Sequence, residues 1–142
     1  MSNLRHYPIT MENLVSILRE CGIQPTPQRI AVVEFILHTK AHPSADQVLK
    51  RVRQQCPTIS RATVYNTLNL LVEKGLLKAQ ILKEGTVVFD SNIKQHHHFI
   101  DEDTGNIYDI PWNALKVTGE KSLKGFQVRE YQVILRGKRK RK

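Results

Sequence analysis

The fold is decided by residues 60–90, which read SRATVYNTLNLLVEKGLLKAQILKEGTVVFD. Ser60 is a typical helix N-cap, and apolar residues then recur at helical spacing, which predicts a helix over Arg61–Lys74. These apolar positions are Val64, Leu68, Leu71 and Val72. Two short extended runs follow, Leu76–Lys83 and Thr86–Asp90, joined by a glycine-containing turn. A helix followed directly by a hairpin predicts the recognition helix and the wing of a winged helix-turn-helix.

Three more helices are expected before this stretch. The first, Met11–Cys21, follows a threonine cap and carries apolar residues on one face. The dipeptide Thr26-Pro27 opens the second, Gln28–Thr39, because proline is favoured at the first helical position. The segment Ser44-Ala45-Asp46-Gln47 reads as a capping box and starts the third, which is expected to end near residue 55.

A small sheet is expected after the winged helix. The runs His96–Ile100 and Asn106–Ile110 flank a polar turn, and apolar and polar residues alternate over Phe126–Leu135, which predicts a third strand. About 45 residues with three short strands bury too little surface to be stable alone. We therefore expect this region to pack against the same region of a second subunit, forming a homodimer.

Together these patterns predict an α+β protein, with an N-terminal winged helix-turn-helix domain followed by a small α/β dimerisation domain. The expected boundaries are 1–90 for the DNA-binding domain, 91–95 for a hinge and 96–137 for the dimerisation and metal-sensing domain. Residues 138–142 form a basic tail.

Composition and charge narrow the class of protein. No apolar run approaches the roughly 20 residues that cross a bilayer, so we expect a cytoplasmic protein without membrane association. The formal net charge is +9, but six of the 22 basic residues lie in the last seven positions. The remaining 16 basic residues face 13 acidic ones, so charge alone does not establish DNA binding. With two cysteines, a zinc site built from four cysteines of one chain is excluded.

The predicted recognition helix presents polar side chains suited to DNA. Asn66 can make paired hydrogen bonds to adenine, and the ring of Tyr65 can pack against a thymine methyl group. Arg61 and Thr63, near the helix N-terminus, complete the candidate DNA-binding set. The alternative is an ordinary polar helix surface.

A run of three histidines is the strongest chemical feature. Side chains alternate along a strand, so His96 and His98 share one face, about 7 Å apart by strand rise. With His42, Asp90 and Asp109 they would form a site of three histidines and two aspartates. Nitrogen and oxygen ligands without thiolates suit Fe(II), Mn(II) or Zn(II). The alternatives are a solvated histidine cluster and, less favoured, the metal site of an enzyme; no catalytic motif is present.

Several motifs in this order resemble those of the Fur family of metal-responsive regulators. They are Pro25-Thr26-Pro27-Gln28-Arg29, His42-Pro43-Ser44-Ala45-Asp46, Ser60–Leu68, Phe89-Asp90, His96-x-His98 and Gly105-Asn106-Ile107-Tyr108-Asp109. The resemblance covers roughly residues 11–136. It implies a homodimeric repressor, not an enzyme, that binds an AT-rich inverted repeat of double-stranded DNA. It also implies a regulatory metal on the five residues named above.

The branch of the family is indicated by Asp109. Peroxide-sensing PerR proteins carry Asp at this position. The resemblance therefore implies a regulatory Fe(II) or Mn(II), with Zn(II) able to bind in vitro. It also implies that peroxide oxidises a histidine ligand, and the matching positions are His42 and His96. The alternative is the Irr branch, in which haem ends DNA binding. The CxxC pairs of many relatives are absent, and Asp101 and Thr104 stand at one pair's place. Arg129-Glu130 stand where relatives have a second histidine site, so one regulatory site per subunit is expected.

Overall fold

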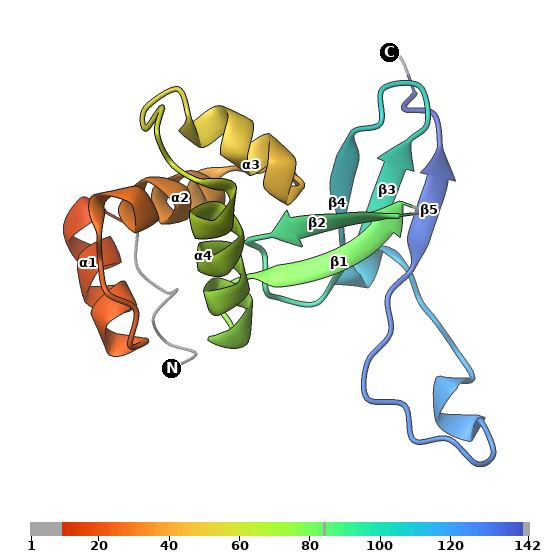
Figure 1. Ribbon diagram of the computed structural model, residues 1–142. Helices are drawn as coiled ribbons and strands as arrows, with labels where there is room; N and C mark the ends of the chain where they lie inside the picture. The colour runs from red at the N-terminus through yellow and green to blue at the C-terminus, as the bar shows by residue number, and fades with distance from the viewer. Residues whose placement is uncertain (1–9, 84, 141–142) are drawn as a thin grey trace. The chain divides into compact units, whose positions relative to one another are not determined.

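The computed structural model describes residues 10–83 and 85–140, and the chain divides into two compact units, Met1–Ile93 and Lys94–Lys142. Figure 1 shows the helices within the first unit and a three-stranded sheet in the second. Within the described residues, no helix has the length and apolar character needed to cross a membrane. Two positions of the expected basic tail, 141 and 142, lie outside the described residues, as does Glu84 of the expected hairpin turn.

Among its described residues, the first unit holds four helices and a two-stranded hairpin. Their bounds are α1 Met11–Glu20, α2 Pro27–His38, α3 Ala45–Val52, α4 Arg61–Glu73, β1 Lys78–Lys83 and β2 Thr86–Asp90. Each helix begins at a residue whose hydroxyl accepts a backbone N–H three residues on: Thr10, Thr26, Ser44 and Ser60. At Ser44 the box is reciprocal, because the Gln47 side chain accepts the Ser44 N–H at 2.8 Å. The predicted helix starts and the hairpin are thus confirmed.

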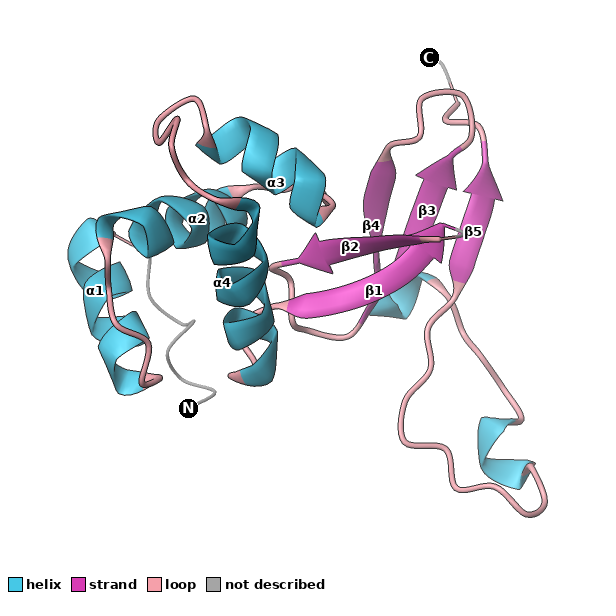
Figure 2. Ribbon diagram, viewed as in Figure 1, coloured by secondary structure: helices cyan, strands magenta, loops and turns pink. Residues whose placement is uncertain are grey.

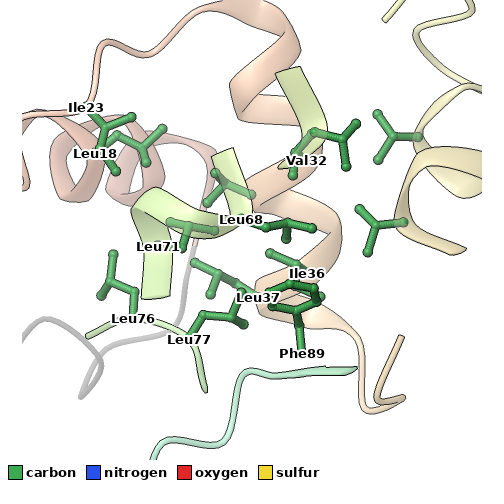
Figure 3. Close-up of a cluster of buried hydrophobic side chains, with 14 of the residues drawn as sticks. Leu18, Ile23, Val32, Ile36, Leu37, Leu68, Leu71, Leu76, Leu77 and Phe89 are labelled. Carbon is green, nitrogen blue, oxygen red and sulfur yellow. The ribbon is translucent and has the colours of Figure 1, made fainter. Parts of the chain in front are cut away.

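A continuous apolar core fills the first unit (Figure 3). Leu68 and Leu71 of α4 are fully buried and pack with Ile36 of α2 and with Phe89 of the hairpin. Cys21 belongs to this core, and burial raises the pKa of its thiol, as expected of a cysteine that acts as a small apolar residue. Because the apolar side of α4 packs into this core, the polar side of the helix is exposed to solvent.

The second unit is built around a three-stranded sheet (Figure 2). Strand β3, His96–Asp101, is central; β4, Ile107–Pro111, pairs with it antiparallel and β5, Ile134–Gly137, pairs with it parallel. Two short 3-10 helices, Trp112–Ala114 and Glu120–Ser122, lie in the long connection between β4 and β5. With four α-helices and two small sheets in the described part of the chain, the α+β class predicted from the sequence is confirmed.

The predicted strand over Phe126–Leu135 is wrong for most of its length. Pairing begins only at Ile134, which lies opposite His98. Phe126 is 76% exposed and Val128 is 39% exposed. These apolar side chains therefore do not pack against a core, as the apolar face of a strand would. A strand requires a hydrogen-bonded neighbour, and within the described residues the segment 126–133 is assigned to no strand.

The turn between β3 and β4 is held by a buried aspartate. The Asp101 carboxylate accepts the backbone N–H groups of Asp103 at 2.9 Å and Thr104 at 3.4 Å. Gly105, with φ of 78°, closes the turn in a left-handed conformation that glycine adopts without strain. The polar turn expected between the two strands is therefore present, and hydrogen bonds to Asp101 hold it.

Candidate metal centre

One half of the predicted ligand set lies in the first unit. His42 comes just before the cap of α3, and Asp90 is the last residue of β2. The Phe89 N–H donates to the Pro43 carbonyl at 2.9 Å and so holds the end of β2 beside this segment. As a result, His42 Nε2 lies 3.2 Å from Asp90 Oδ2, and both side chains are buried. The other Asp90 oxygen accepts the Asn92 N–H at 2.8 Å, which fixes the carboxylate.

The other half lies on the sheet of the second unit. Antiparallel register places His98 of β3 directly opposite Asp109 of β4, and His96 is two residues along on the same face. The Nε2 atoms of His96 and His98 lie 3.4 Å and 3.8 Å from the same oxygen, Asp109 Oδ1. The two imidazole rings meet edge to face, with centroids 4.6 Å apart. The alternation predicted from the sequence therefore brings both rings to one carboxylate.

In each ring, the nitrogen that faces away from Asp109 is Nδ1, and its hydrogen bond fixes the orientation of the ring. His96 Nδ1 donates to the Lys94 carbonyl at 2.6 Å, and His98 Nδ1 donates to Gln132 Oε1 at 3.0 Å. A ring protonated at Nδ1 is neutral when Nε2 carries a lone pair, and that lone pair is the group that binds a metal. Histidine ligands in metal sites commonly have such a hydrogen bond at the other nitrogen. Both rings thus direct Nε2, and not Nδ1, toward Asp109.

His97, on the opposite face of β3, has a structural role. Its ring stacks on Trp112 with centroids 4.6 Å apart, and Tyr131 packs against Trp112 at 4.7 Å. The Val133 N–H donates to His97 Nδ1 at 2.9 Å. These contacts hold residues 131–133 against β3, and Gln132 in that segment reaches His98 on the other face.

In the second unit, His96, His98 and Asp109 offer three ligand atoms within 4.8 Å of one another. In the first unit, His42 and Asp90 offer a further nitrogen and oxygen. Imidazole and carboxylate donors without sulfur suit a first-row divalent cation such as Mn(II), Fe(II) or Zn(II). The donor chemistry of both groups therefore fits the predicted metal.

The predicted DNA-binding residues lie along the first half of α4. Tyr65 and Asn66 are exposed, as is Arg61, whose guanidinium pairs with the Asp46 carboxylate. Thr63 is half-buried, and its hydroxyl is hydrogen-bonded to that of Ser60 at 2.9 Å, so it also takes part in the helix cap.

The sequence reasoning missed three residues that contact the candidate site residues. Asp46 contacts both Arg61 and Tyr65, Gln132 orients His98, and the Lys94 carbonyl orients His96. Asp46 was recognised as part of a capping box and of a family motif, but not as a partner of Arg61 or Tyr65. Gln132 lay on a predicted strand. No spacing rule connects Gln132 to a histidine 34 residues away.

The profile described as the ferric uptake regulator family matches residues 20–136. The chain belongs to the ferric uptake regulator family. Among curated proteins of this family, the peroxide operon regulator of Bacillus subtilis strain 168 is 32% identical over 129 residues, 89% of each chain. Proteins of this family are transcription regulators, so this Fur-family chain is a metal-responsive regulator and not an enzyme.

Solved structures agree with this assignment. The ferric uptake regulator from Pseudomonas aeruginosa with manganese has a TM-score of 0.66 at 23% identity, covering 89% of this chain and 97% of that one. At that identity the likeness concerns the fold. The structure of PerR from Streptococcus pyogenes, a protein described as sensing peroxide and regulating genes, has a TM-score of 0.52 at 30% identity. The match covers 90% of this chain and 89% of the PerR chain.

Proposed function

We propose that this Fur-family chain is a repressor that binds DNA when Fe(II) or Mn(II) is bound and releases it after peroxide oxidation. One observation carries the proposal. The Nε2 atoms of His96 and His98 converge on Asp109 Oδ1, and both Nδ1 atoms donate to carbonyl oxygens. The peroxide-responsive relatives at about 30% identity support the sensing chemistry.

The proposed ligands are His42, Asp90, His96, His98 and Asp109. Three come from the second unit and two from the first. A single ion bound by all five would therefore hold together the two units that the segment 91–95 connects. Such a link would favour one arrangement of the winged helix relative to the dimerisation unit. A bound ion shifts a conformational equilibrium only by its difference in affinity for the two states. Here His42 and Asp90 would supply that difference, because they would bind the ion in one arrangement only.

Bound Fe(II) would supply the reaction with peroxide that oxidises a neighbouring imidazole, at His42 or His96. The chain's own contribution is to hold these rings. Asp90 fixes His42, and the Lys94 carbonyl fixes His96 with Nε2 directed to Asp109. Oxidation of either ring would weaken the nitrogen ligand, so the ion would no longer hold both units. DNA binding would then be lost.

On the DNA side we propose a homodimer that places two copies of α4 in successive major grooves of an AT-rich inverted repeat. Dimeric readers need their half-sites about one helical turn apart, so a metal that fixes the position of α4 raises affinity. Tyr65 and Asn66 would contact bases, and Arg61 and Thr63 would lie near the backbone at the helix N-terminus.

The test is DNA-binding anisotropy with a duplex that the Mn(II)-loaded protein selects from a randomised pool. Chelator should weaken binding, and dilute peroxide should abolish it only in the Fe(II) form, with the mass of one oxygen added to His42 or His96. Asp109→Ala should remove the response to metal, whereas Tyr65→Ala should weaken DNA binding and leave metal affinity unchanged.

The contrary outcomes are equally clear. If Asp109→Ala still binds DNA only with metal present, the ligand assignment is wrong. If haem, detected by a Soret band, releases DNA and peroxide has no effect on the Fe(II) form, the signal is haem instead.

A further inference from the structure

Asp46 lies next to the polar side of the recognition helix. It is the second residue of α3, just after the Ser44 cap, and its side chain is 64% exposed. Its own helix does not need this carboxylate for capping, because Ser44 and Gln47 complete the capping box between them. The carboxylate is instead directed to another helix.

Two side chains of α4 share one oxygen of this carboxylate. The Tyr65 hydroxyl donates to Asp46 Oδ1 at 3.2 Å, and the Arg61 guanidinium forms an ion pair with the same atom. The hydrogen bond and charge of Asp46 raise the pKa of Arg61 above its ordinary value. The Arg61 guanidinium also lies 6.0 Å from the centre of the Tyr65 ring. Asp46 therefore fixes the two large side chains of the candidate DNA-binding set relative to each other.

Stability gives little reason for this arrangement. The side chains of Arg61 and Asp46 are 62% and 64% exposed, and ion pairs in such settings contribute little because water screens them. An acidic group beside a DNA-reading helix also carries an electrostatic cost, since it repels phosphates. A carboxylate in the first turn of α3 also stabilises that helix end, but this effect does not depend on the contact with Arg61 and Tyr65. The contact itself is better explained by selectivity.

We propose that Asp46 is a specificity-determining residue, which positions Tyr65 and neutralises Arg61 so that non-cognate DNA gains little from phosphate attraction. The proposal rests on the DNA-binding function proposed above. On any duplex, Arg61 must give up its Asp46 partner before it contacts phosphate. On the cognate DNA sequence, base contacts from the positioned Tyr65 offset the loss of the Arg61–Asp46 ion pair. On other DNA sequences no such contact offsets it.

The two roles of Asp46 can be separated by substitution. Asp46→Asn removes the charge and keeps an oxygen that can accept the Tyr65 hydroxyl, whereas Asp46→Ala removes both. Asp46→Glu keeps the charge and tests rescue. Asp103→Asn is the matched control, because Asp103 is an exposed carboxylate that pairs with Lys138 at 3.8 Å in the second unit. It changes the net charge by the same amount at a residue of the second unit, whereas α4 belongs to the first.

The experiment uses the full-length protein with saturating Mn(II) and two duplexes: the one that wild type selects from a randomised pool, and a scrambled version. Affinity is measured from low to moderate salt. We expect Asp46→Asn to bind the scrambled duplex several-fold more tightly, with a salt slope steeper by about one released counterion. Asp46→Ala should in addition lose about tenfold or more on the selected duplex. Asp46→Glu should retain most of the wild-type selectivity.

The outcomes separate this proposal from the proposed function. If Asp46→Asn and Asp103→Asn change both affinities by the same factors, overall charge explains the effect and the role of Asp46 is refuted. If Asp46→Ala keeps the wild-type ratio between the two duplexes, positioning of Tyr65 is refuted as well. If wild type itself selects no sequence from the pool, the proposed repressor function fails first.

Discussion

The interiors of the two units have opposite compositions. The first unit buries a large set of aliphatic residues together with Phe89 (Figure 3). Among the described residues of the second unit, Ile100 is the one apolar side chain that is buried. The other buried side chains there are His96, His97, His98 and Asp101. Leu123 and Phe126 of the second unit are more than half exposed.

This difference shows that the units depend on different forces. Apolar burial drives folding in the first unit and is non-directional. A polar interior is stable only if each group has its partner, and removing one partner is costly. The histidines of β3 meet this need through Asp109, Gln132, Lys94 and Val133. A metal ion and a second subunit are therefore expected to matter most for the second unit.

The largest expected effect comes from the apolar core. Leu68→Ala removes a fully buried side chain from α4 and should lower the free energy of unfolding by about 2–5 kcal/mol, because the core cannot close the cavity completely. Urea unfolding followed by helical circular dichroism measures the change. Val87→Ala, at a site 44% exposed on β2, is the control and should change stability by less than about 0.5 kcal/mol. Equal losses in both variants would show that the first unit does not depend on its core.

Metal should act most strongly on the second unit. Mn(II) at 100 times its dissociation constant should stabilise the native state by about 2.7 kcal/mol if it binds only that state. Amide hydrogen exchange should show the added protection chiefly in β3 and β4, next to His96, His98 and Asp109. Asp109→Ala should show no such protection. The same protection in that variant would mean that Mn(II) binds elsewhere.

The smallest of these effects concerns Gln132. Gln132→Leu removes the acceptor at His98 Nδ1 and should weaken Mn(II) binding about 10–100-fold, because the ring loses the contact that orients it. Isothermal titration calorimetry measures the affinity. Gln127→Leu, an exposed residue of the same connection, is the matched control. If both variants bind Mn(II) as wild type does, His98 is held by its strand alone.

Local sequence signals predicted the first unit well. Thr10, Thr26, Ser44 and Ser60 were expected to cap helices and do so, since capping involves residues only three positions apart. The same reasoning failed over Phe126–Leu135, because a strand depends on a partner that alternation alone does not supply. The turn at Asp101 was expected, since its hydrogen bonds are also local.

The sequence by itself determined the helices and the hairpin of the first unit, the family, and the shared strand face of His96 and His98. Backbone periodicity fixes which neighbours share a strand face. Only the tertiary structure decided that His98 lies opposite Asp109, that Gln132 reaches its far nitrogen and that Asp46 holds Arg61 and Tyr65. These pairs are joined by strand register and helix packing. Both arise from the summed burial of many side chains, and no local spacing encodes them.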